Sequence, residues 1–246
     1  MHTRSRTKGA IKHFLQKRWL RIIVIYIPFL FLASSITIVV LYKYFPVTYT
    51  PLMALRGFEH RNDNTFRTYK VWKPLDEISP SLAMAAMSSE DIRFVIHRGF
   101  DWKSINIARL EHKTGKGLRG ASTISQQTAK NVFLLPHRSW VRKGLEAYFT
   151  FGIELIWGKK RILEVYLNVI ELGSGIYGAE AASQYYYHKP AKLLTQRESA
   201  LITACFPDPL HRNPTKPTGN MQTRADAIER ISSLLPVPDW LLTSDK

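Results

Sequence analysis

The sequence predicts a mainly α-helical domain behind a single N-terminal membrane-spanning helix. Two observations carry this prediction: a charge-free apolar run near the N-terminus, and helical periodicity over 67–236 with no series of strands. Hydrophobic residues make up 45% of the 246 residues, which is enough for a packed core and excludes a disordered chain. A single cysteine, Cys205, excludes a disulfide scaffold and is expected in the core.

The apolar run over 22–41 has the length of a membrane anchor, because about 20 helical residues cross a hydrocarbon core of about 30 Å. Seven cations and no acid precede it, and only Lys43 follows it before Arg56. The positive-inside rule therefore predicts a cytoplasmic tail over 1–21 and an external body. A cleaved signal peptide is the alternative, but its apolar region is usually about 7–15 residues long. We expect a juxtamembrane connector over 42–66.

The charge balance predicts an anionic partner. The chain has 35 Lys and Arg against 19 Asp and Glu, and removing the seven cations of the tail from the net charge of +16 leaves +9. A basic body outside the cytoplasm is expected to meet membrane lipids or an anionic substrate, and no nucleic acid.

The helices are predicted by their caps and glycines. Asp101, Thr123 with Gln126, Ser139 and Thr195 with Glu198 are typical first residues, with Ser122 as the alternative to Thr123. The expected helices cover 80–89, 101–113, a segment from 122 or 123, 139–157, 159–170, 179–187, 195–206 and 222–235. Loops are expected at Gly115, Gly117 and Gly120 and at Gly173, Gly175 and Gly178, and a tail is expected over 237–246.

Glu90 and Asp91 are the first candidate site. They follow an apolar helix, where a carboxylate is partly desolvated, as suits a general base. The alternative is a pair of exposed helix-end acids bound to Arg93 or Arg98. His97 is expected to be a structural, hydrogen-bonded histidine, because no second His or Cys stands at metal spacing.

Two further patterns place polar groups on helix faces. Gln127, Lys130 and Asn131 share a face behind a glycine-rich loop, which suits an anion. Arg142 and Lys143 stand four and three residues before Glu146, as in a phosphate clamp or in an ordinary helical ion pair.

Glu164 and Asn168 also share a face, and for them a buried hydrogen-bond network is as good an interpretation as a site. Glu198 is most simply a capping-box residue.

Five sequence blocks, taken together and in this order, resemble the motifs of a known family. The blocks are EDIRFVIHRGFD (90–101), GASTISQQTAKN (120–131), RKGLE (142–146), KRILEVYLNVIELGSGIYGAEAAS (160–183) and ESALITACFPDPLHRNP (198–214). The chain closely resembles the monofunctional biosynthetic peptidoglycan transglycosylases of glycosyltransferase family 51, whose domain also occurs in class A penicillin-binding proteins. Ala121 and Tyr187 depart from the residues most common in that family, Gly and Phe.

The resemblance implies a lysozyme-like helical domain over 67–236 that polymerises lipid II into glycan strands. Glu90 would be the general base that takes the proton of the acceptor GlcNAc 4-hydroxyl, whose oxygen attacks C1 of the donor MurNAc with inversion. Glu146 would be the second carboxylate, and Asp91 would orient the Glu90 loop. The resemblance further implies a substrate-binding set, which is Ser122, Thr123, Gln127, Lys130, Asn131, Arg142 and Lys143.

The implied partners are lipid II, the growing glycan strand, membrane lipids, and penicillin-binding and cell-division proteins. A divalent cation, Mg or Mn, is expected at the pyrophosphate, and no organic cofactor. The expected location is the bacterial inner membrane, with the catalytic domain in the periplasm. A lytic, lysozyme-like wall hydrolase and a non-catalytic membrane scaffold are the alternatives. The hydrolase would have no use for a pyrophosphate-binding set of cations, and the scaffold would keep its cellular role when Glu90 is replaced by Gln.

Overall fold

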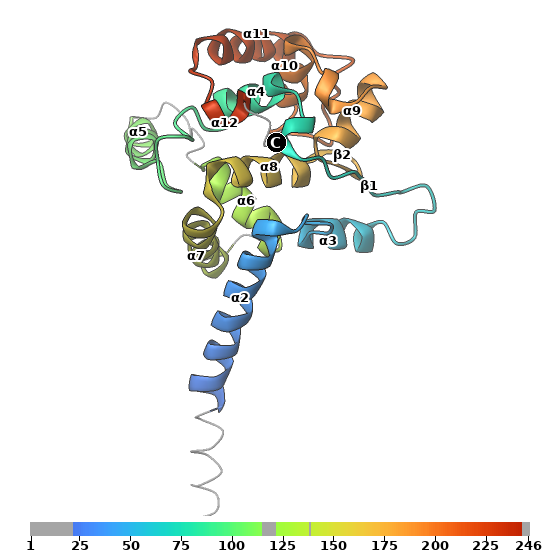
Figure 1. The fold of residues 1–246 in the computed structure, drawn as a ribbon. Helices are drawn as coiled ribbons and strands as arrows, with labels where there is room; N and C mark the ends of the chain where they lie inside the picture. The colour runs from blue at the N-terminus through green and yellow to red at the C-terminus, as the bar shows by residue number, and fades with distance from the viewer. Residues whose placement is uncertain (1–21, 115–121, 138, 243–246) are drawn as a thin grey trace, which may run out of the picture. The chain divides into compact units, whose positions relative to one another are not determined.

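The computed structural model describes residues 22–114, 122–137 and 139–242 and divides the chain into two units, one ending at Tyr44 and the other beginning at Phe45 (Figure 1). The first unit is a π-helical turn, η1 (Ile22–Tyr26), continued by α2 (Ile27–Tyr44). Its span Ile23–Tyr44 has 22 residues and a length of about 33 Å, and an 18-residue window of that span has a mean hydropathy of 2.5. The predicted apolar helix is therefore present, and it is consistent with a single-pass membrane anchor.

The second unit is mainly helical, which confirms the predicted fold class. Its α-helices are α3 (Pro51–Glu59), α4 (Pro80–Glu90), α5 (Trp102–Lys113), α6 (Ile124–Phe133), α7 (Trp140–Ile156), α8 (Gly158–Val169), α9 (Ala179–Tyr187), α10 (Gln196–Ala204), α11 (Gly219–Leu234) and α12 (Asp239–Leu242). Two 3-10 turns, η2 (Leu75–Glu77) and η3 (Ala191–Leu193), complete the helical elements of the described chain. The predicted tail over 1–21 and the loop glycines 115, 117 and 120 lie outside the described residues.

The predicted caps begin their helices. The Asp101 carboxylate accepts hydrogen bonds from the first turn of α5, and Ser139 does the same for α7. Thr123 and Thr195 form complete capping boxes, so Thr123 rather than Ser122 is the cap of α6. Helix α11 begins at Gly219 rather than at 222, because Thr218 caps it one turn earlier.

A small sheet departs from the prediction of no strands. It contains β1 (Tyr69–Lys70), β2 (Glu171–Gly173) and β3 (Ile176–Tyr177) in the order β1-β3-β2, with β1 parallel and β2 antiparallel to β3. Strands of two or three residues are too short to show the alternation by which strands are recognised in a sequence.

Of the connector predicted over 42–66, residues 45–66 belong to the second unit and are bound to the rest of it. Arg56 Nε donates to Glu171 Oε1 at 3.1 Å, and the Arg161 guanidinium donates to the carbonyl of Phe45. The Lys70 ammonium donates to the carbonyl of Val47. The predicted boundaries at 66 and 236 stay predictions, while these contacts show that the segment packs as part of this unit.

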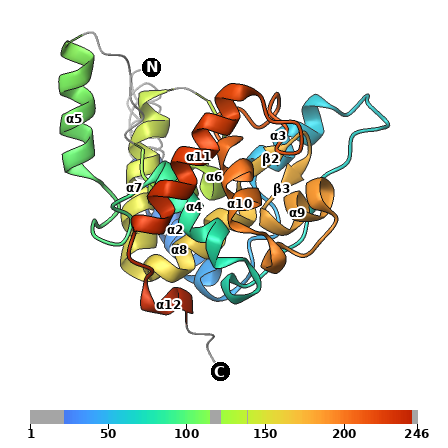
Figure 2. The same ribbon diagram turned by 90° about the horizontal axis from the view of Figure 1, so that it is seen from above.

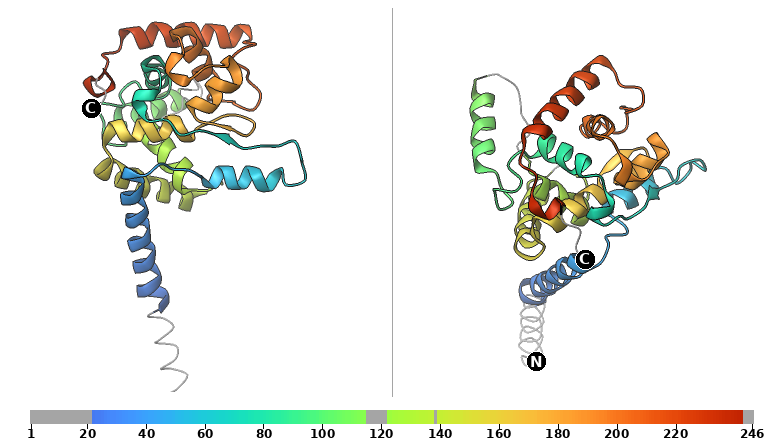
Figure 3. Two further views of the ribbon diagram at one scale, coloured as in Figure 1. Left: turned by 45° about the vertical axis from the view of Figure 1, so that its right-hand side comes forward. Right: turned by 45° about the horizontal axis from the view of Figure 1, so that its top comes forward.

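The core centres on α4 and α8. Helix α4 is buried over Leu82–Ser88, and most side chains of α8 after Arg161 are buried. Small residues of α4, α10 and α11 pack around Ile228 and let these helices approach closely. Figures 2 and 3 show α11 lying across α4 and α10, and α5 standing away from these helices. Cys205 is buried, as expected of a core residue.

Candidate active site

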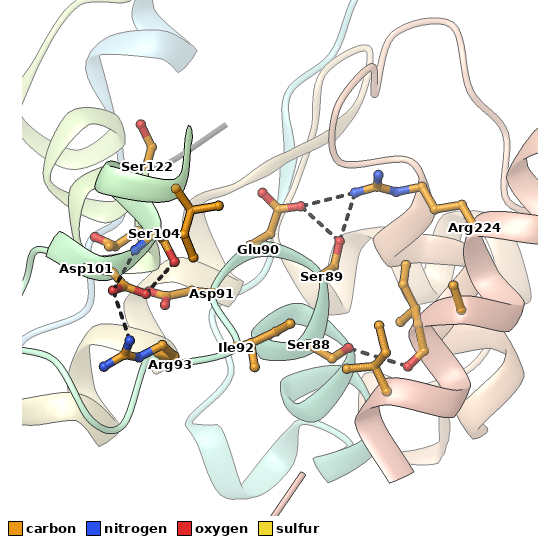
Figure 4. A pocket seen from close by; sticks show the side chains of 15 residues that line it. Ser88, Ser89, Glu90, Asp91, Ile92, Arg93, Asp101, Ser104, Ser122 and Arg224 are labelled. Carbon is orange, nitrogen blue, oxygen red and sulfur yellow. Dashed lines mark hydrogen bonds and ion pairs between the residues drawn. The ribbon is translucent and has the colours of Figure 1, made fainter. Parts of the chain in front are cut away.

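Glu90 ends the buried helix α4, and its carboxylate is held by three groups. Oε1 accepts a hydrogen bond from Ser89 Oγ at 3.1 Å, and Oε2 accepts one from Gln127 Nε2 at 3.1 Å. The Arg224 guanidinium of α11 lies 3.5 Å from Oε1, and the Glu90 side chain is 18% exposed (Figure 4). The alternative of an exposed acid paired with Arg93 or Arg98 is therefore wrong for Glu90.

A cavity of about 380 Å³ lies beside this carboxylate, between the end of α4, the start of α5 and one side of α11. Its polar wall includes Arg93, Asp101 and Ser104, and its apolar wall includes Ile107 and Ile231. Ser122 also faces it from the loop before α6 (Figure 4). Pockets of small-molecule sites have about 300–1,000 Å³ and combine apolar walls with a few polar groups, so this cavity has the size and character of a binding site.

Asp91 connects the end of α4 to the start of α6. Its side chain is only 3% exposed, and its two oxygens lie 2.9 Å from His97 Nε2, while Oδ2 also accepts from the amide of Ile124 at 3.0 Å. His97 is thus the hydrogen-bonded histidine that the sequence predicts. Gly99 has a φ of +86°, and its carbonyl accepts from Thr123 Oγ1 at 2.6 Å. These contacts fix the loop that follows Glu90 against α6.

The predicted face of α6 divides into two parts. Gln127 uses both ends of its amide, since it donates to Glu90 and accepts from the fully buried Tyr166 Oη at 3.3 Å. Lys130 and Asn131 are half-buried, and their side chains have no hydrogen bond or ion pair to any residue that the structure describes. Burial lowers the pKa of Lys130, because it removes solvent from the ammonium.

The predicted ion pairs on α7 are present. Arg142 Nη1 lies 2.6 Å from Glu146 Oε2, and the Lys143 ammonium contacts Oε1 of the same carboxylate, which is 4% exposed. The charges of Glu146 and Glu90 both raise the pKa of Lys130, and those of Arg142 and Lys143 lower it, although burial outweighs them. Lys130 is therefore within electrostatic reach of both carboxylates. We call Lys130, Arg142 and Lys143 the cation cluster.

The remaining predicted residues are placed as follows. Ser122 is exposed on the cavity wall, while the hydroxyl of Thr123 is occupied by Gly99 and by the capping of α6. Asn168 hydrogen-bonds both backbone groups of Lys73 at 2.8 Å, and Glu164 accepts from the amide of Leu75 at 2.9 Å. Glu164 and Asn168 thus form a structural network.

Glu198 is the capping-box residue that the sequence predicts, and it also pairs with Lys189 at 2.6 Å.

The described residues fit a protein-held divalent cation poorly. No group of three His, Cys, Asp or Glu side chains gathers within them. The carboxylate nearest to the phosphate-binding pattern, Glu146, is already paired with Arg142 and Lys143, whereas a hard cation needs several oxygen ligands.

Sequence reasoning missed Arg224 and Tyr166, which approach Glu90 from α11 and α8. A signal for Arg224 exists in the sequence, because it precedes Ile228 and Ile231 by four and seven residues and so lies on the same helix face. One cation on an apolar helix face indicates a site residue only once the structure shows that Glu90 lies next to it.

Comparisons with known proteins identify the family of the chain. The transglycosylase family matches residues 59–232. A biosynthetic peptidoglycan transglycosylase of Bacteroides thetaiotaomicron is 49% identical over 207 residues, covering 84% of each chain. Proteins of the same description from Caulobacter vibrioides and Bdellovibrio bacteriovorus are 48% and 47% identical, covering 88% and 90% of this chain and 92% and 90% of theirs. The chain belongs to the transglycosylase family.

Proposed function

We propose that Glu90 is the general base with which this membrane-anchored peptidoglycan glycosyltransferase polymerises lipid II. The observation that carries the proposal is a carboxylate at a cavity wall, held by Ser89, Gln127 and Arg224, with the cation cluster within electrostatic reach through Lys130. Glu90 takes the proton of the acceptor GlcNAc 4-hydroxyl, and the oxygen forms a bond to C1 of the donor MurNAc. The bond from C1 to undecaprenyl pyrophosphate breaks, and the configuration inverts.

One chemical base is sufficient for this reaction, because pyrophosphate leaves without needing a proton from a general acid. The negative charge that develops on the leaving group needs cations instead. Lys130 is suited to this task, since burial has removed solvent from its ammonium and no described residue forms a hydrogen bond or ion pair with it. Arg142 and Lys143 supply the remaining charge, and Glu146 keeps their side chains in place.

We propose a divalent cation only as one that is bound to the pyrophosphate of the substrate. Mg²⁺ is usually held by one or two carboxylates together with substrate phosphates, so a cation can arrive with the pyrophosphate. Removal of Mg²⁺ and Mn²⁺ with a chelator, followed by a rate measurement on lipid II, tests this; an unchanged rate would remove the cation from the proposal.

The membrane orientation is inferred from charge. The seven cations before the apolar helix predict a cytoplasmic N-terminus and a periplasmic domain at the inner membrane. Protease added to spheroplasts should digest the domain and leave an N-terminal tag intact; the reverse pattern would contradict the orientation. Penicillin-binding and cell-division proteins are proposed partners, and cross-linking in cells tests them.

The test of the activity compares the detergent-solubilised full chain with two variants on labelled lipid II. Wild type is expected to make long glycan, and Glu90→Gln is expected to polymerise about 10²- to 10⁴-fold more slowly. Glu77→Gln is the matched control, because Glu77 is 53% exposed and pairs with Lys73 away from the cavity, and it should behave as wild type. Release of fragments from finished glycan, without polymer from lipid II, would favour a lytic hydrolase.

A further inference from the structure

Arg224 reaches Glu90 from a part of the chain that carries no motif of the site. It lies on α11, and its Nη2 donates to Ser89 Oγ at 2.9 Å and lies 3.5 Å from Glu90 Oε1. Ser89 Oγ in turn donates to the same Oε1 at 3.1 Å, so the three side chains form a triangle on one carboxylate oxygen (Figure 4). We propose that Arg224 is a positioning residue that orients the Glu90 carboxylate toward the acceptor; this inference rests on the proposed function.

The triangle restrains a torsion that glutamate otherwise leaves loose. The terminal torsion of a Glu side chain is broad, so an isolated carboxylate samples many orientations. Here Oε1 is held from α11 through Arg224 and Ser89, and Oε2 is held from α6 through Gln127. The plane of the carboxylate is therefore set by two elements that lie far apart in the sequence.

The distances leave Glu90 able to accept a proton. At 3.5 Å the guanidinium attracts Oε1 by its charge but does not form a good hydrogen bond with it. A carboxylate has about four lone-pair sites, and the two hydrogen bonds from Ser89 and Gln127 occupy only two of them. A substrate hydroxyl in the cavity thus finds an acceptor site that is oriented and unoccupied by the described residues.

The bonding of Arg224 differs from that of a purely structural arginine. Its Nε is buried and has no hydrogen-bond partner within the described residues, and only Nη2 makes a side-chain hydrogen bond there. Buried donors are normally satisfied, so a side chain placed for stability alone is expected to use them. The guanidinium instead lines the cavity together with Glu90.

The experiment measures kcat and KM on labelled lipid II for the full-length chain. Arg224→Gln is expected to lower kcat about 10- to 100-fold with KM within about twofold, since displacement of a reacting group costs up to about 10²-fold in rate. Arg224→Lys should recover part of the loss, because it retains the charge. Arg230→Gln is the matched control on the same helix, since Arg230 is exposed and has no hydrogen bond or ion pair to a described residue.

The outcomes separate the inference from the function on which it rests. Equal kcat values for Arg224→Gln and Arg230→Gln, or a loss that appears only in KM, would overturn the positioning role while wild-type polymerisation still supports the function. If Arg224→Gln does not fold, Ser89→Ala decides, because it removes the hydroxyl that both partners use. A lowered kcat with an unchanged melting temperature supports the inference, and an unchanged kcat overturns it.

Discussion

The two carboxylates of the site, Glu90 and Glu146, have the same side chain and opposite surroundings. Glu90 is 18% exposed at a cavity wall and receives hydrogen bonds from two neutral groups, with a cation at 3.5 Å. Glu146 is 4% exposed and contacts two cations directly, one of them at 2.6 Å. Both oxygens of Glu146 are thus occupied by cations, whereas Glu90 retains lone-pair sites that no described residue occupies.

The site thus separates proton transfer at one end from charge stabilisation at the other. The Glu90 end is built by α4, α6 and α11, and the Glu146 end by α6 and α7. Helix α6 contributes to both, because Gln127 contacts Glu90 while Lys130, one turn later, feels both carboxylates. The spacing of three residues on one helix therefore fixes the base and the cation cluster relative to each other.

The largest expected effect is the loss of kcat when Glu90 is replaced by Gln. Glu90→Gln keeps the shape and the hydrogen bond to Ser89 but removes the proton acceptor. Because general base catalysis contributes about 10²–10⁴-fold, we expect kcat on lipid II to fall by that factor. The melting temperature should stay close to that of wild type, and a variant that retains more than a tenth of the wild-type kcat would exclude Glu90 as the base.

The next largest effect is expected on kcat/KM when Lys130 of the cation cluster is replaced by Met. Lys130→Met should lower kcat/KM about 10²- to 10³-fold, as loss of one preorganised group that stabilises developing negative charge does. The same change should raise the melting temperature at pH 7. Burial lowers the pKa of Lys130 in the folded chain below its unfolded value. The charged ammonium therefore destabilises the folded state at pH 7. This destabilisation is lost only as pH rises through the folded pKa. A lower melting temperature would contradict the account.

The smallest expected effect is a loss of stability at Asp101, which lies in the cavity wall and caps α5. Asp101→Ala should reduce the free energy of unfolding by about 0.5–2 kcal/mol, the usual cost of losing a cap. Burial raises the pKa of Asp101, but its hydrogen bonds with Ser104 and the charges of Arg93 and His97 together outweigh this and lower the pKa overall. The stabilisation is therefore present above the unfolded pKa of about 3.8 and is lost as pH falls through the folded value. Denaturant unfolding at pH 7 and pH 3 measures this, and an equal difference at both pH values would contradict it.

Much of this architecture could be predicted from the sequence, because it depends on contacts between neighbours in the chain. The caps Asp101 and Thr123 and the pairing of Glu146 with Arg142 follow from spacings of two to four residues. The strands escaped prediction because two or three residues show no alternation, and Arg224 escaped because it meets Glu90 only after α11 packs across α4. The spacing of Arg224 from Ile228 and Ile231 marks its helix face, but nothing local in the sequence names Glu90 as its partner.

The most direct test of the central claim applies one substitution to both carboxylates. Glu90→Asp and Glu146→Asp each keep the charge and withdraw it by one methylene, and kcat is measured at saturating lipid II. A base must meet its proton at hydrogen-bond distance, whereas flexible Arg142 and Lys143 side chains can follow a displaced partner. We predict that Glu90→Asp loses at least tenfold more kcat than Glu146→Asp. Equal losses, or a larger loss at Glu146, would contradict the assignment of Glu90 as the base.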